Sequence, residues 1–103
     1  MCIRDRAKAP GIDGFYIGPS DLAFSMGLNP RSFKESAEHS AACQKVLDVA
    51  RANGIVAGTH CFSIEETVER FEQGFMLCPA FSDGSLLASA AKSVLEKVKM
   101  VQT

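Results

Sequence analysis

Three pairs of polar residues could carry chemistry in this chain of 103 residues, and each pair follows an apolar, strand-like run. The pairs are Ser20-Asp21, Thr59-His60 and Ser82-Asp83. In parallel α/β folds the carboxyl ends of the strands meet on one face, which is where ligands bind. A carboxylate is a hard ligand suited to a divalent cation. Asp21 is therefore a candidate metal ligand, and Asp83 is the one further carboxylate at an expected strand end.

Each of these residues also has a simpler structural interpretation. Asp21 and Asp83 both precede helical segments, where an acidic side chain commonly caps the helix N-terminus. His60 could bond its ring to nearby backbone, and no catalytic dyad with Cys61 is expected because neighbours on a strand point to opposite faces. His39 falls on a polar stretch and is expected at the solvated surface.

The elements that must position these residues alternate between strands and helices. Strands are expected over 15–17, 55–61 and 75–81. Pro79 marks a bulge or an early end of the third strand, because proline cannot donate to the ladder. The first strand breaks at Gly18-Pro19 and feeds a short helix over 22–26. The second strand is apolar at consecutive positions, which indicates burial on both faces.

Capping patterns predict the three longer helices. The capping boxes Ser32–Glu35 and Ser63–Glu66 begin the first two helices, which are expected over 32–52 and 64–73. The polar segment before residue 86 caps a last helix over 86–101. Its expected apolar face consists of Leu87, Ala91, Val94, Leu95 and Val98. The order β-α-β-α-β-α predicts parallel strands joined by right-handed crossovers.

A free-standing sheet of three parallel strands would leave both edges open and the apolar last helix without neighbours. We therefore expect the chain to be a piece of a larger barrel or to pair with another subunit. Residues 1–10 show no clear period and are expected to be a connector or a non-native segment, with the βα units over 11–103.

The composition excludes several functional classes. The chain is 47% hydrophobic and 22% charged, which is typical of a globular protein. The net charge of −1 without a basic patch argues against a nucleic-acid partner, and no apolar run is long enough to indicate a membrane span. The four cysteines follow no zinc or disulfide spacing, so free thiols and a cytoplasmic location are expected.

The segment 11–23 reads GIDGFYIGPSDLA and is followed by Ser25-Met26-Gly27. It resembles the signature of the HpcH/HpaI aldolase family, the metal-dependent 2-keto-acid aldolases such as 4-hydroxy-2-oxoheptanedioate aldolase. The resemblance extends over about residues 11–100. It implies an α/β chain that forms the C-terminal part, strands six to eight, of a TIM (β/α)8 barrel.

The resemblance also implies a site. Asp21 would be one of two carboxylates that hold Mg²⁺ or Mn²⁺, while Gly18, Pro19 and Ser20 would border the keto acid. The backbone N–H groups of Ser20 and Asp21 would face its carboxylate. The implied reaction cleaves a 4-hydroxy-2-keto acid to pyruvate and an aldehyde, with the cation acting as a Lewis acid.

The family's second metal carboxylate, its catalytic arginine and its catalytic histidine belong to earlier strands that this sequence does not contain. No catalytic residue is therefore assigned here. The chain by itself is expected to be an inactive fragment, and its full-length parent a homo-oligomer. Two other hypotheses stand beside this one: a fragment that docks on a partner, and an anion-binding α/β module that uses the helix starts after Ser20 and Ser82. The module lacks a phosphate-type glycine-rich loop.

Overall fold

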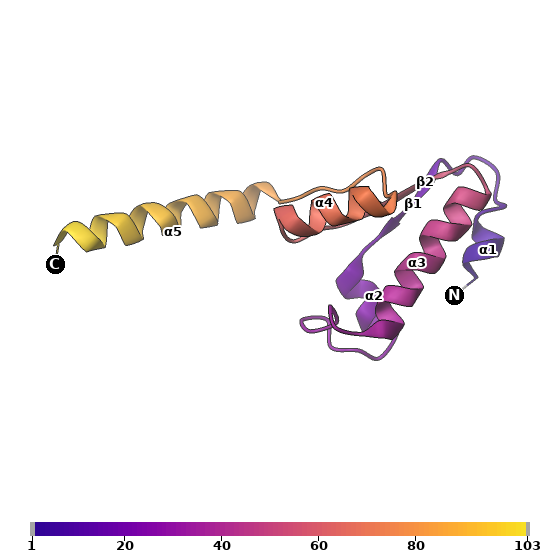
Figure 1. Cartoon of the computed structure of the whole chain (residues 1–103), viewed down its shortest axis with the longest axis horizontal. Helices are drawn as coiled ribbons and strands as arrows, with labels where there is room; N and C mark the ends of the chain where they lie inside the picture. Colours follow the sequence, from indigo (N-terminus) through magenta and orange to yellow (C-terminus); the bar gives the residue numbers. More distant parts are fainter. Residues whose placement is uncertain (1, 103) are drawn as a thin grey trace.

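Two short parallel strands, β1 (Gly14–Ile17) and β2 (Val56–Thr59), form the sheet of the computed structural model, which describes residues 2–102 (Figure 1). Their first residues pair with each other, and so do their last. Gly14 allows the two backbones to approach, since a Cβ at this position would lie 2.5 Å from the carbonyl oxygen of Val56. The expected parallel pairing of the first two strands is confirmed.

The third expected strand, 75–81, is present only as an isolated parallel bridge between Gly58 and Leu77. Two backbone hydrogen bonds of 2.8 and 2.9 Å around this bridge join the segment to β2. Pro79 follows two residues later and has no N–H with which to extend the ladder. The expectation of three full strands is therefore wrong in extent, because the third is a short bridging segment.

The long helix α3 runs over Ala37–Ala52 and covers one side of the sheet. Its cap is Ser36, whose Oγ accepts a hydrogen bond from the N–H of His39 at 3.2 Å. The predicted capping box Ser32–Glu35 is wrong, since that segment forms turns. The turns let Phe33 reach the interior, where its side chain is 6% exposed.

The capping box at the start of α4 (Ile64–Gln73) is confirmed. The Ser63 Oγ accepts from the N–H of Glu66 at 3.1 Å, and the Glu66 Oε2 accepts from the N–H of Phe62 at 3.0 Å. The helix ends at Gly74, whose φ of +110° lies in the left-handed region that favours glycine. The two bonds at the helix start explain why this prediction needed only local sequence.

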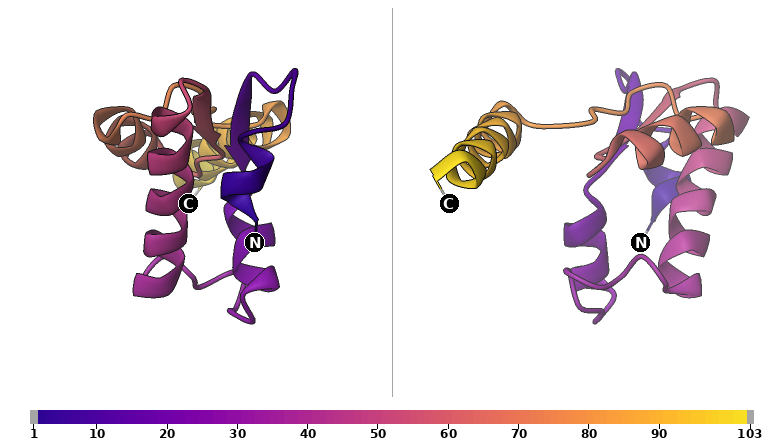
Figure 2. Two further views of the ribbon diagram at one scale, coloured as in Figure 1. Left: turned by 90° about the vertical axis from the view of Figure 1, so that its right-hand side faces the viewer. Right: turned by 60° about the vertical axis from the view of Figure 1, so that its left-hand side comes forward.

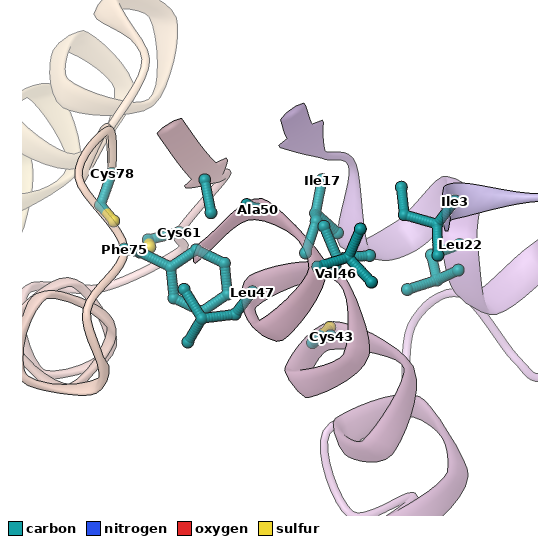
Figure 3. Packing of buried hydrophobic residues seen from close by; sticks show 12 residues of the cluster. Ile3, Ile17, Leu22, Cys43, Val46, Leu47, Ala50, Cys61, Phe75 and Cys78 are labelled. Atoms are coloured by element: carbon teal, nitrogen blue, oxygen red, sulfur yellow. The ribbon is translucent and has the colours of Figure 1, made fainter. Parts of the chain in front are cut away.

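Two short helices, α1 (Ile3–Arg6) and α2 (Pro19–Ser25), pack beside α3 and complete the body of the molecule (Figure 2). Buried side chains from these helices, both strands and the 75–78 segment form one cluster (Figure 3). Its members are Ile3, Ile17, Leu22, Cys43, Val46, Leu47, Val49, Ala50, Ala57, Cys61, Phe75 and Cys78. Ile3 thus takes part in the core, and Ala7 packs against it.

The last helix, α5 (Asp83–Gln102), projects away from this body (Figures 1 and 2). The Ser82 Oγ caps it by accepting from the N–H of Ser85 at 3.2 Å. The chain consequently measures 61 × 27 × 21 Å along its principal axes. The predicted apolar face is exposed, with Leu87 at 74%. Over the described residues, no helix combines the length and apolarity that a membrane crossing requires.

Candidate functional site

The polar motif after β1 lies inside the first turn of α2. The helix begins at Pro19 with Gly18 as its N-cap, and the N–H of Leu22 donates to the Gly18 carbonyl at 2.9 Å. The expected helix over 22–26 therefore starts three residues too late. Asp21 is the third residue of α2, so the alternative that it is the N-cap is wrong.

The Asp21 side chain is exposed and turns back toward the start of α2. A Cβ added to Gly18 would lie 2.9 Å from the Asp21 Oδ2, so a larger residue at position 18 would crowd this carboxylate. Within the described part of the chain, no hydrogen bond or ion pair engages the Asp21 carboxylate. The N–H groups of Ser20 and Asp21 belong to the first turn, where they have no partner within the helix. A free carboxylate and two free donors thus lie side by side.

The end of β2 meets the end of β1. The Nδ1 of His60 lies 3.3 Å from the Tyr16 hydroxyl, and its ring stands edge-on to that of Phe62 with 5.0 Å between centroids. These residues line a cavity of about 240 Å³ together with Gly18 and Asp21. The ring of His60 therefore contacts side chains, in contrast to the expected bond to local backbone. Partial burial raises the pKa of the Tyr16 hydroxyl.

The third expected strand end is close to the second but does not join Asp21. Ser82 lines a neighbouring cavity of about 330 Å³, which shares His60 with the cavity at Asp21. Asp83 lines neither cavity, and its Oδ1 accepts from the N–H of Gly84 at 2.7 Å. Residues 2–102 contain no group of three His, Cys, Asp or Glu side chains that could hold a metal ion. No shared cavity brings Asp83 to Asp21 as a second carboxylate.

His39 is a buried residue, so its expected surface position is wrong. It is 2% exposed, and its Nε2 lies 2.8 Å from the carbonyl oxygen of Pro19. Its ring stacks on that of Phe33 with 4.4 Å between centroids. The polar sequence around His39 gives no sign of this burial, because the contact depends on how α3 packs against the start of α2. Tyr16 was also missed, although strand alternation places it on the same side as Gly18.

The cysteines are free thiols, as expected. Cys43, Cys61 and Cys78 are buried, and burial raises the pKa of each thiol. Buried neutral thiols are poor nucleophiles. Cys2 is exposed.

A larger cavity, about 420 Å³, opens between α3 and α4 on the helical side. Part of its charged lining is paired, since Glu66 lies 3.6 Å from the Lys34 Nζ and 4.0 Å from the Arg70 guanidinium. These pairs connect α4 internally and to the 31–35 segment, which is a structural role. The free carboxylate at the strand ends is the stronger candidate for a functional group.

No family model matches the chain. Among curated proteins, the chain is 36% identical over 85 residues to the hydroxypyruvate/pyruvate aldolase of Rhizorhabdus wittichii, which covers 82% of this chain and 34% of that protein. It is 31% identical over 87 residues to the 4-hydroxy-2-oxo-heptane-1,7-dioate aldolase of Shigella sonnei, covering 82% of this chain and 31% of that protein. The chain thus spans about a third of the length of these relatives.

Solved structures also match this chain over only part of their own length. The chain superposes on an HpcH/HpaI aldolase/citrate lyase family protein from Burkholderia cenocepacia with a TM-score of 0.87 and 26% identity, over 94% of this chain and 37% of that one. It superposes on a citrate synthase variant with a TM-score of 0.83, over 100% of this chain and 45% of that one. At 20% identity the second match supports the fold alone.

Proposed function

The chain belongs to the HpcH/HpaI aldolase family, and from this premise we propose that it forms strands six to eight of a metal-dependent aldolase barrel. The parent enzyme would cleave a 4-hydroxy-2-keto acid to pyruvate and an aldehyde. The observation that carries the proposal is the placement of Asp21, whose unpaired carboxylate shares a cavity with His60 at the carboxyl ends of two parallel strands. In barrel enzymes this face carries the active site.

Asp21 is the residue that would hold the cation. Its exposed carboxylate has no neutralising partner among the described residues, and carboxylate oxygen is the ligand that Mg²⁺ and Mn²⁺ prefer. A bound divalent cation supplies a Lewis acid for the keto group of the substrate. The donor set fits such an ion in part, since one carboxylate leaves its other coordination positions to water, substrate or groups from elsewhere.

The first turn of α2 would bind the carboxylate of the keto acid. Pro19 opens the helix without an N–H, so the first available donors are those of Ser20 and Asp21. Gly18 has no side chain to block the approach of the substrate. The negative charge of Asp21 disfavours a bare anion at the same turn. This charge argues for cation-assisted binding and against the simple anion-binding module.

Three further proposals concern the activity of the chain, the assembly of its parent and its location in the cell. We propose that the chain by itself releases no pyruvate from a 4-hydroxy-2-keto acid, because a single carboxylate does not complete the metal centre. A homo-oligomeric parent would cover the open sheet edges, and the free thiols fit a cytoplasmic protein. Measurable pyruvate release by the purified chain with Mn²⁺ would contradict the first of these statements.

The metal-binding role can be tested with paramagnetic Mn²⁺ and ¹H–¹⁵N spectra of the chain. Substoichiometric Mn²⁺ is expected to broaden the amide signals of Ser20 and Asp21 before others. Asp21→Asn should abolish the effect, because an amide oxygen lacks the charge that holds the ion. Asp13→Asn is the matched control, since Asp13 is an exposed acid that precedes β1. Equal broadening in the wild type and in Asp21→Asn would refute the assignment.

A further inference from the structure

We propose that His39 is a positioning residue for the turn from Pro19 to Asp21, an inference that rests on the proposed function of Asp21. The imidazole is 2% exposed and its Nε2 lies 2.8 Å from the Pro19 carbonyl oxygen. The two residues belong to different helices, α3 and α2. Through this contact, α3 holds the turn that carries the candidate metal ligand Asp21.

The chemistry of the contact fixes the state of the ring. A carbonyl oxygen can only accept, so the Nε2 of His39 must carry the proton that is donated to Pro19. The Nδ1 then presents a lone pair, and the Cys43 Sγ lies 3.8 Å away, within reach of a thiol hydrogen bond. Stacking on Phe33, with 30° between the ring planes, holds the orientation. The imidazole is therefore locked by a contact on each nitrogen and one on its face.

The start of α2 needs such support. Its N-cap is Gly18, which offers no side-chain hydrogen bond, and the helix has only 7 residues. Short helices are marginal without tertiary contacts. The bond from His39 joins the first residue of α2, two positions before Asp21, to a long and well-capped helix. The direction of the Asp21 carboxylate and of the Ser20 and Asp21 N–H groups follows from this attachment.

The alternative is that His39 is only a space-filling core residue. In that case an apolar residue of similar size would serve equally well. His39→Leu removes the donor and keeps an apolar side chain, whereas His39→Gln retains an N–H donor near the same place. Ser63→Ala is the matched control, because it removes the cap of α4 and leaves α3 and the bond to Pro19 untouched.

The experiment measures amide hydrogen exchange and Mn²⁺ broadening in these variants. The N–H of Leu22, bonded to the Gly18 carbonyl, reports on the turn, and the N–H of Thr59, bonded to Leu77, reports on the sheet. His39→Leu is expected to speed exchange at Leu22 about tenfold and to weaken Mn²⁺ binding at Asp21 about tenfold, as the loss of one buried hydrogen bond implies. Exchange at Thr59 should not change.

Rescue by glutamine decides between the two roles. His39→Gln should bring both quantities to within about threefold of the wild type if the donor is what matters. Faster exchange at Leu22 and Thr59 alike, no rescue by glutamine, or an equal selective effect in Ser63→Ala would overturn the positioning role. If wild-type chain shows no Mn²⁺ effect at Asp21, the proposed metal site fails, while the exchange data still decide whether His39 holds the turn.

One measurement needs no variant and covers the case in which His39→Leu does not fold. The ¹⁵N shifts of the His39 ring in the wild type should show a protonated Nε2 and an unprotonated Nδ1. The opposite tautomer would overturn the proposal, because Nε2 could not then donate to Pro19.

Discussion

Replacing Gly58 with alanine should loosen the attachment of the 75–79 segment to the sheet. A Cβ at Gly58 would lie 2.9 Å from the Leu77 carbonyl oxygen and 3.0 Å from the Tyr16 Cδ2. Both contacts are closer than ordinary van der Waals separation. Backbone on one side and an aromatic ring on the other must therefore shift to admit a single methyl group.

The magnitude follows from these contacts. Overpacking a well-packed site costs about 1–3 kcal/mol. Movement of Leu77 also lengthens its 2.9 Å hydrogen bond from the N–H of Thr59, and such a bond contributes about 0.5–1.5 kcal/mol. We expect Gly58→Ala to lower the free energy of unfolding of the packed body, without α5, by about 2–3 kcal/mol, near the upper part of the overpacking range.

Urea unfolding followed by tyrosine fluorescence measures this loss. Tyr16 is the one tyrosine of the chain, which has no tryptophan, and it lies beside Gly58. Gly84→Ala is the matched control, because a Cβ there meets no atom within 4 Å. That control should leave the Tyr16 transition unchanged. The reasoning is refuted if Gly58→Ala unfolds at the same urea concentration as the wild type, or if both variants lose the same stability.

Two other predictions concern a helix cap and the thiols. Ser63→Ala should cost about 1 kcal/mol in urea unfolding, whereas Ser32→Ala should cost nothing, because Ser32 caps no helix. An aromatic disulfide reagent at pH 8 should label Cys2 at once and the three buried thiols slowly, because burial raises their pKa. The folded state binds these protons more tightly, so their contribution to stability is complete below the ordinary thiol pKa of about 8.5 and is lost as the pH rises through the higher folded pKa. Equal labelling of all four thiols would contradict this prediction. So would a urea midpoint concentration that increases when the pH is raised above about 8.5.

Features that depend on neighbouring residues could be predicted from the sequence. The Ser63–Glu66 box and Gly74 define α4 by bonds within one or two turns, and both were found as expected. The two strands and their parallel pairing also follow from apolar runs separated by a helix. The polar motif at Asp21 was recognisable because its residues are consecutive.

Features that depend on packing between elements could not be predicted. No helix starts at the Ser32–Glu35 pattern, because Phe33 lies between turns and stacks on His39. The burial of His39 arises from the meeting of α3 with the start of α2, which no local pattern encodes. The exposure of the apolar face of α5 is different, since the last helix was expected to lack neighbours in a free-standing sheet, and its described residues are exposed.

The projection of α5 has a consequence for how the molecule unfolds. The radius of gyration is 17.4 Å, against about 13 Å for a compact domain of this size. A helix without tertiary support melts gradually, whereas a packed body unfolds in one cooperative step. Heating should therefore produce two unlinked transitions: a broad loss of far-ultraviolet ellipticity from the helix, and a sharp change at Tyr16. No single free energy of unfolding then describes the whole chain.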